Sequence, residues 1–213
     1  MLRGAGSSEP SAMKNPYSEI APRLPEGERL DPRSLLGASG PIELEIGPGR
    51  GGFLFERLAT DPALCMIGLE IRLKWASLVD KRLREQGLGE RARVFAEDAR
   101  RAVTRFTDAS ITAVHLNFPD PWWKKRHEKR IVLGDGLLGE IVRVLVPGGA
   151  MFIQTDVAER ADMYEALFKA RLEFSFSGPT PRIEHNPFGA RSPREHRAIA
   201  DGLPIHRLRY ERR

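Results

Sequence analysis

The clearest chemical signal in the sequence is an aspartate between two prolines, followed by aromatic and basic side chains. Pro119, Asp120 and Pro121 stand in a row, and residues 122–127 read Trp-Trp-Lys-Lys-Arg-His. Prolines on both sides stiffen the backbone, so the turn should present the carboxylate in one direction. Aromatic rings can stack on an unpaired base, and lysines and arginines can hold its phosphates. The pattern predicts a site where Asp120 meets a nucleic-acid base. The alternative is that the two tryptophans are buried in the core and the basic residues after them form a solvated turn.

A second signal is a glycine-rich turn after a short apolar run at residues 42–46. Gly47, Gly49 and Gly51 are evenly spaced, unlike the dinucleotide-binding pattern, in which the third glycine comes three positions after the second. This spacing favours a cofactor without a diphosphate. Glu45, just before the turn, would repel phosphate but can accept a hydrogen bond from an ammonium group. S-adenosyl-L-methionine has an amino-acid end and no phosphate, so the turn predicts this cofactor.

Two further acidic residues stand near the ends of later apolar runs. Glu70 lies in the run at residues 66–71, and Asp98 follows the run at residues 93–96. In nucleotide-binding folds, an acid at the tip of the second strand holds the ribose hydroxyls, and Asp98 is placed to accept from an adenine amino group. Each acid alone could be a helix cap or a surface charge. Together with Glu45 they predict one cofactor site.

The elements that must position these residues alternate between strand-like and helix-like patterns. Such alternation predicts a parallel sheet with helices on both faces, in which the strand ends that carry the acids share one edge. Two later runs, at residues 173–177 and 205–210, predict an antiparallel edge. The expected fold is therefore α/β and Rossmann-like, with a mostly parallel sheet. The expected strands are 42–46, 66–71, 93–96, 111–117 and 150–155, and the expected helices are 52–59, 74–86, 132–145 and 158–170.

The ends of the chain differ in composition from this alternating region. Residues 1–41 contain closely spaced prolines, which predicts an extended arm ahead of one domain at residues 42–213. Residues 178–204 are rich in proline and arginine and are expected to form a long substrate-binding loop, since long loops in compact domains are usually functional.

Positive charge is concentrated in two segments, residues 122–130 and 191–213. Each carries a net charge of +4, whereas the whole chain carries +5, so the remainder is net negative. Concentrated positive charge favours a polyanionic partner, with a solvated surface as the alternative.

Composition excludes several other classes of protein. No apolar run is long enough for a membrane helix, and the first residues do not resemble a secretory signal, so we expect a cytoplasmic protein. The one cysteine, Cys65, lies in an apolar run and is expected to be a buried thiol. Neither a disulfide nor a metal site is expected.

The sequence resembles the bacterial tRNA (guanine-N7)-methyltransferases. The resemblance covers nearly the whole chain, from Asn-Pro-Tyr at residues 15–17 to the C-terminal stretch at 192–212. It is most specific at residues 44–51 (LEIGPGRG), 117–130 (NFPDPWWKKRHEKR) and 155–157 (TDV). It implies a class I methyltransferase fold that transfers a methyl group from S-adenosyl-L-methionine to N7 of guanine 46 in the tRNA variable loop. tRNA is the implied partner, and no protein partner, membrane or metal is implied.

The resemblance also assigns roles to individual residues. It implies a cofactor site at Glu45, Glu70, Asp98 and Asp120, with Asp120 also catalytic. The substrate-binding positions that it implies are Lys124, Asp156, Ser192, Pro193, Arg194 and Glu195.

This chain departs from the family in two places. Its Ser-Pro-Arg-Glu segment at residues 192–195 stands where the family usually has Thr-x-x-Glu, and its basic run ends one arginine early, at Arg130. Two alternatives remain open from the sequence. One is a methyltransferase of the same fold that acts on another substrate, and the other is a non-enzymatic RNA-binding protein.

Overall fold

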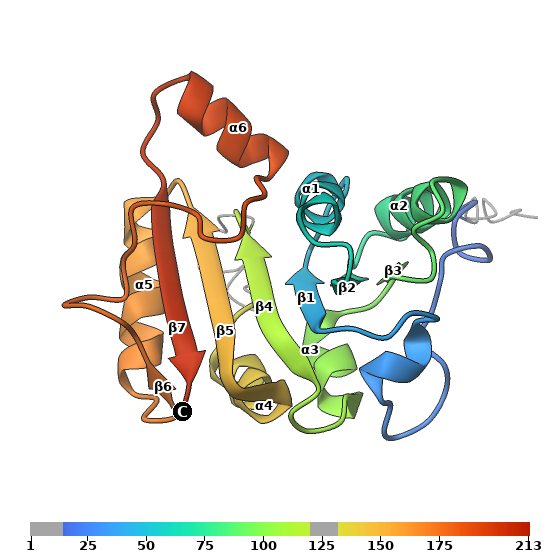
Figure 1. Cartoon of the computed structure of the whole chain (residues 1–213), viewed down its shortest axis with the longest axis horizontal. Helices are drawn as coiled ribbons and strands as arrows, with labels where there is room; N and C mark the ends of the chain where they lie inside the picture. Colours follow the sequence, from blue (N-terminus) through green and yellow to red (C-terminus); the bar gives the residue numbers. More distant parts are fainter. Residues whose placement is uncertain (1–14, 120–131) are drawn as a thin grey trace, which may run out of the picture.

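The computed structural model describes residues 15–119 and 132–213, and within them seven strands form one sheet. The strand order is β3-β2-β1-β4-β5-β7-β6 (Figure 1). Strands β1 to β5 pair in parallel, whereas β7 is antiparallel to both β5 and β6. The predicted α/β fold with an antiparallel edge is thus confirmed. The strands are β1 (Ile42–Ile46), β2 (Cys65–Leu69), β3 (Ala92–Phe95), β4 (Ile111–Asn117), β5 (Leu145–Thr155), β6 (Phe174–Ser175) and β7 (His206–Arg212).

Helices cover both faces of the sheet, as expected. Apolar residues of α1 and α2 form one cluster with β2 and β3, and those of α3, α4 and α5 pack against the other face. The helices are α1 (Gly52–Thr60), α2 (Leu73–Glu85), α3 (Ala99–Ala102), α4 (Asp135–Val144), α5 (Ala158–Lys169) and α6 (Pro193–Ala200), with 3-10 turns η1 (Pro32–Leu35) and η2 (Val103–Arg105).

Strand β1 directs apolar and acidic side chains to opposite faces of the sheet. Ile42, Leu44 and Ile46 belong to the cluster that includes α3, α4 and α5. Side chains alternate along a strand, so Glu43 and Glu45 face the α1 side, where both are buried. Two buried acids in a central strand need polar partners, and these organise the site described below.

The main differences from expectation lie at element ends. Strand β5 begins at Leu145, five residues before the apolar run from which it was predicted, because Leu145 pairs with Ile111 across a register shift. The first part of the strand could not be predicted from the sequence, because it contains a proline and two glycines at residues 147–149, and such residues usually interrupt strands. Helix α4 accordingly ends at Val144.

The long loop expected at residues 178–204 contains a helix, α6. Ser192 caps it, with its hydroxyl accepting from the Glu195 backbone N–H at 3.1 Å, and Pro193 occupies its first turn. Serine at the cap, proline next and glutamate three positions on is a helix-start pattern, which the proline and arginine content had obscured.

Residues 15–41, the described part of the expected arm, pack against the domain. Leu24 and Leu30 are buried in the core, and the backbone N–H of Ala96 donates to the Pro22 carbonyl at 2.7 Å. Cys65 is fully buried, as expected.

Candidate functional site

A cavity of about 490 Å³ opens at the carboxyl ends of the parallel strands. It is lined by Gly47 after β1, Glu70 after β2, Asp98 after β3 and Asn117 at the end of β4. Open parallel sheets hold their ligands at this edge. Three residues that the sequence analysis singled out from separate segments are therefore brought to one cavity, and Tyr164 from α5 also lines it.

The glycine turn between β1 and α1 has a backbone that other residues would adopt only with strain. Gly47, Gly49 and Gly51 have φ angles of 71°, 57° and 77°, which lie in the left-handed region that favours glycine. The backbone N–H of Gly49 donates to Oε2 of Glu70 at 2.9 Å. This hydrogen bond connects the turn to the end of the second strand.

Glu70 and Asp98 both receive hydrogen bonds from nearby arginines. Glu70 accepts from the backbone N–H of Arg72 at 2.9 Å and from its Nε at 3.0 Å. Asp98 caps α3, and its hydrogen bonds with Arg100 lower the pKa of its carboxyl below the usual range. Asp98 is thus a helix cap, which was the alternative to a cofactor-binding role, and it also lines the cavity.

Glu45 lies behind the wall of the cavity and does not line it, although its neighbours Gly47 and Asn117 do. Its Oε1 accepts from Nδ2 of Asn117 at 3.1 Å, whereas its buried Oε2 has no hydrogen-bond partner among residues 15–119 and 132–213. Burial, reinforced by the charge of Glu70, raises the pKa of Glu45 to about 8. A buried oxygen without a partner beside a cavity fits a ligand that brings a cationic donor, such as the amino group of S-adenosyl-L-methionine.

The expected substrate-binding residues lie at the start of α6 and at the end of β5. Asp156, which follows β5, accepts from Nε of Arg194 at 3.1 Å. Pro193 and Arg194 are exposed, whereas Ser192 is buried as the helix cap.

Glu195 is completely buried beneath α6. Its two oxygens accept from Nε2 of Gln154 at 3.1 Å, Nδ2 of Asn186 at 3.0 Å and Nη2 of Arg207 at 2.9 Å. Its side chain therefore faces the sheet and not the surface. Gln154 was not among the predicted site residues. The signal that could have found it is a glutamine directly after the apolar residues 150–153 of the strand.

Two residues of the expected site, Asp120 and Lys124, lie outside the described residues, as does the basic run at 122–130. The chain leading to Asp120 is described. Phe118 has a left-handed φ of 48°, and Phe118 and Pro119 both line the cavity. Such strain in a residue other than glycine is typical of functional sites.

The described residues contain neither a cluster of metal-binding side chains nor a helix that could span a membrane. Among them, no group of three histidine, cysteine, aspartate or glutamate side chains is placed to hold a metal ion. No helix in the same residues has the length and apolar character needed to cross a membrane.

Comparison with known proteins gives one consistent family. Residues 39–208 match the family model described as "Putative methyltransferase". The tRNA (guanine-N(7)-)-methyltransferase of Myxococcus xanthus (strain DK1622) is 37% identical, over 82% of this chain and 84% of its own. The protein of the same name from Anaeromyxobacter dehalogenans (strain 2CP-C) is also 37% identical, over 84% of this chain and 90% of its own.

Solved structures agree on the fold. The 16S rRNA methyltransferase KamB superimposes with a TM-score of 0.61 at 14% identity, over 91% of this chain and 98% of its own. TrmN from Thermus thermophilus does so with a TM-score of 0.57 at 19% identity, over 83% of this chain and 45% of its own. At these identities the likeness shows the fold alone. From its match over most of the chain to the curated relatives, the protein belongs to the bacterial tRNA (guanine-N7)-methyltransferase family, whose cofactor is S-adenosyl-L-methionine.

Proposed function

We propose that the protein methylates N7 of guanine 46 in the variable loop of tRNA. The observation that carries the proposal is the cavity at the strand ends, where the glycine turn, Glu70 and Asp98 meet. In this assignment Glu70 accepts from the ribose hydroxyls, Asp98 from the adenine amino group, and Glu45 from the amino group of the cofactor. A tRNA substrate also implies that the protein works in the cytoplasm.

The chemistry asks the protein mainly for positioning. S-adenosyl-L-methionine supplies a methyl group on a positively charged sulfur. Guanine N7 carries a lone pair and no proton, so it needs no general base; the N7–carbon bond forms as the carbon–sulfur bond breaks, and the bonding pair returns to sulfur. The protein must hold the two reactants in line and stabilise the purine cation that results.

Asp120 is the residue proposed to orient the guanine. A carboxylate that accepts from the N1 and N2 hydrogens would hold the base and favour its cationic product. Asp156 is proposed to help orient the base from the end of β5, while Lys124, with Arg194 at the start of α6, would hold the RNA backbone. Ser192, Pro193 and Glu195 are proposed to shape this part of the substrate site. Replacing Asp120 with alanine should abolish methyl transfer without unfolding the protein, and equal activity of variant and parent would reject this role.

The deciding experiment uses the purified protein, methyl-labelled S-adenosyl-L-methionine and tRNA that lacks the modification. Label should enter the tRNA, and chain cleavage at N7-methylguanine should map it to position 46. A tRNA with adenine at position 46 is the matched control and should accept no label. Label at another position, or in protein, would replace the proposed substrate. Cofactor binding without transfer to any tRNA would reject the proposed reaction.

A further inference from the structure

Buried polar side chains cross the sheet from the cofactor site to helix α6. Gln154 donates through Nε2 to Oδ1 of Asn117 at 2.8 Å and to Oε2 of Glu195 at 3.1 Å. Asn117 in turn donates through Nδ2 to Oε1 of Glu45 at 3.1 Å. Gln154, Glu195 and Glu45 are at most 2% exposed. One continuous chain of hydrogen bonds thus joins β1, β4, β5 and α6.

The donors in this chain all have a defined direction. Glu195 accepts from Arg207 at one oxygen, so its carboxylate also requires donors at the other oxygen. Asn186 supplies one donor to that second oxygen, and the NH₂ group of Gln154 supplies the other. The Gln154 carbonyl accepts from Nε of Arg207 at 3.2 Å, which fixes the same orientation, and the NH₂ group also reaches the Asn117 carbonyl. That contact leaves the Asn117 NH₂ group facing Glu45. Glu45 consequently receives a donor, which favours its ionised form.

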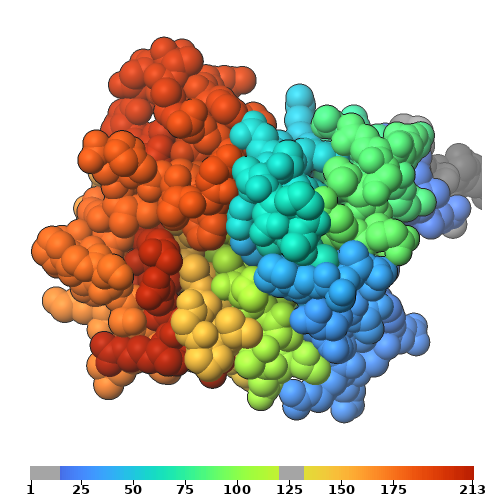
Figure 2. All heavy atoms as spheres, in the orientation of Figure 1, coloured from blue at the N-terminus to red at the C-terminus, as the bar shows by residue number. Residues whose placement is uncertain are grey.

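Helix α6 is also held against the glycine turn and α1. A Cβ atom added to Gly52 would lie 2.4 Å from the Pro193 ring, so the two residues are in close contact. Figures 1 and 2 show α6 and the segment before it beside α1. The position of α6 is thus tied to the cofactor turn by direct packing as well as by the polar chain.

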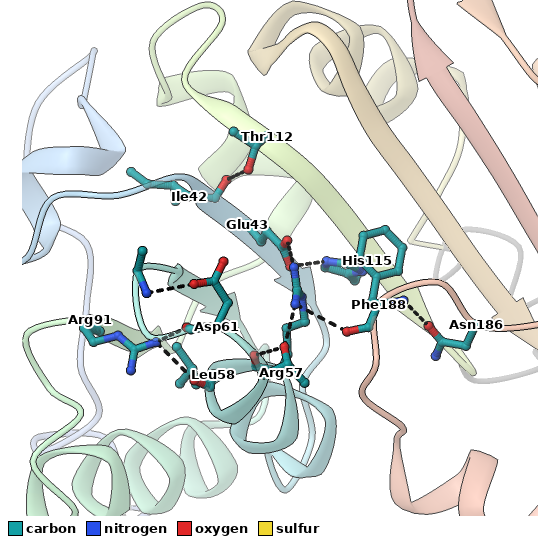
Figure 3. Close-up of polar contacts among 12 residues, drawn as sticks. Ile42, Glu43, Arg57, Leu58, Asp61, Arg91, Thr112, His115, Asn186 and Phe188 are labelled. Carbon is teal, nitrogen blue, oxygen red and sulfur yellow. Dashed lines mark hydrogen bonds and ion pairs between the residues drawn. The ribbon is translucent and has the colours of Figure 1, made fainter.

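A separate buried network holds the segment that leads into α6. Arg57 and His115 contact the Glu43 carboxylate at 2.7 Å, and Arg57 donates to the Phe188 carbonyl at 3.3 Å (Figure 3). Burial by itself would raise the pKa of Glu43, but these partners lower it to about 2. The Phe188 ring packs edge-on against His115, with ring centroids 4.5 Å apart. These contacts fix the position of the segment, so the Asn186 side chain stays within hydrogen-bonding distance of Glu195.

We propose that Asn117, Gln154 and Glu195 are positioning residues that couple the position of α6 on the sheet to the cofactor site. Glu195, together with Arg207, orients the Gln154 amide. Gln154 orients the Asn117 amide, and Asn117 supports the carboxylate form of Glu45. The inference rests on the proposed function, in which Glu45 accepts from the amino group of the cofactor. In this inference Glu195 affects cofactor binding indirectly, through the hydrogen bonds that lead to Glu45, and does not act by contacting RNA.

The test is Glu195→Gln, which keeps the shape of the side chain and removes the requirement for donors at both oxygens. Arg207 keeps an acceptor facing it, so the new amide turns its NH₂ group toward the NH₂ group of Gln154 and displaces the Gln154 amide from its contact with Arg207. The Asn117 amide then loses its fixed donor direction toward Glu45, which disfavours the ionised form of Glu45. Binding of S-adenosyl-L-homocysteine, measured by calorimetry without tRNA, should weaken about tenfold, as for the loss of one hydrogen bond to a charged group. The midpoint in the pH dependence of this affinity should also rise.

Asp80→Asn is the matched control. Asp80 is fully buried and pairs with Arg93 and Arg84 between α2 and β3, outside the polar chain. Its replacement should lower the free energy of unfolding without moving the pH midpoint of cofactor binding. The charge that acts on Glu45 within the described residues is that of Glu70, which is present in every variant. If Glu195→Gln does not fold, Gln154→Met removes both donors and tests the same chain.

The outcomes separate this inference from the proposed function. If Glu45→Gln weakens cofactor binding but Glu195→Gln and Gln154→Met leave affinity and midpoint unchanged, the coupling is rejected and the site assignment stands. If Glu195→Gln weakens only tRNA binding, Glu195 serves the RNA directly and the coupling is again rejected. If Glu45→Gln itself has no effect, the proposed cofactor site is wrong.

Discussion

Pro193 at the start of α6 packs so closely against Gly52 at the start of α1 that no side chain fits between them. A Cβ atom on Gly52 would lie 2.4 Å from both Cγ and Cδ of the proline ring. Gly52 directly follows the turn at residues 47–51, and Pro193 belongs to the segment proposed to hold tRNA. The two proposed binding regions therefore share one contact.

Gly52→Ala should impair methyl transfer more than it impairs folding. Overpacking costs about 1–3 kcal/mol, and the better helix propensity of alanine returns about 1 kcal/mol, so the free energy of unfolding should fall by no more than about 2 kcal/mol. Displacing α6 should lower kcat/KM for tRNA on the order of ten- to a hundredfold. Steady-state kinetics and urea unfolding measure the two effects.

Gly136→Ala is the control for this substitution. Gly136 also lies in the first turn of a helix, α4, but a Cβ atom there meets nothing within 4 Å. This variant should be stabilised by up to about 1 kcal/mol and keep full activity. Equal activity of Gly52→Ala and Gly136→Ala would show that the close contact has no part in substrate positioning.

The sequence was sufficient to predict the sheet and most of its helices because their signals are local. Strand β1 was predicted with its observed bounds, since a run of five residues ends at a glycine turn. Acids at strand ends were also predictable, because carboxyl ends of parallel strands meet at one edge. Glu70 and Asp98 accordingly line one cavity.

Contacts between distant segments could not be predicted in the same way. Nothing near Glu195 in the sequence shows that Gln154 and Arg207 lie beneath it, because strand pairing creates that environment. The resemblance marked Glu195 as a substrate position but could not show that its side chain faces the sheet. Helix α6 was missed because its capping pattern lies within a proline- and arginine-rich stretch.

Glu45 should make the cofactor-free protein less stable as the pH rises. Its pKa is about 8 in the folded protein against an ordinary 4.5. Between pH 4.5 and pH 8 the folded state holds a proton that the unfolded state has lost. The free energy of unfolding therefore decreases as the pH rises, by up to about 1.4 kcal/mol per pH unit. The pKa of Glu43 is lowered to about 2, so its titration affects the free energy of unfolding only below its ordinary pKa of 4.5 and not between pH 4.5 and pH 8.

Urea unfolding of the parent protein and Glu45→Gln between pH 5 and pH 9 measures this effect. The variant cannot titrate at position 45, so its stability relative to the parent should increase with pH up to about 8 and then level off. A constant difference between the two proteins across the range would show that Glu45 is ionised throughout.

Glu70→Ala should weaken cofactor binding more than tRNA binding. Its carboxylate accepts from Gly49 and lines the cavity, so the variant loses both a proposed ligand contact and a support of the glycine turn. Affinity for S-adenosyl-L-homocysteine should fall about ten- to a hundredfold, as for hydrogen bonds to a charged group. Glu85→Ala, which removes an exposed carboxylate from α2, is the control and should bind normally. Unchanged calorimetric affinity in Glu70→Ala would remove Glu70 from the proposed site.

The two basic segments should act together on tRNA, although one lies outside the described residues. Arg194 and Arg197 are exposed on α6, and Lys124 and Arg126 follow the end of β4 in the sequence. Each phosphate contact contributes about one unit to the slope of log affinity against log salt, or somewhat less on single strands. Alanine at Lys124 and Arg126, or at Arg194 and Arg197, should therefore weaken tRNA binding and flatten this slope, with cofactor binding nearly unchanged.

Arg194 should act on tRNA binding differently from Arg197, because Arg194 is already paired with a carboxylate. Arg194 pairs with Asp156, so in Arg194→Ala the carboxylate remains without that partner and repels nearby phosphate. This variant should bind tRNA more weakly than the parent protein at low salt, and the difference in affinity between the two proteins should narrow as added salt screens the repulsion. Lys81→Ala, on α2, is the control for removing an exposed cation. Filter binding of tRNA across a salt series measures all of these variants. An unchanged slope in both double variants would mean that the basic segments are solvated surface and that the RNA binds elsewhere.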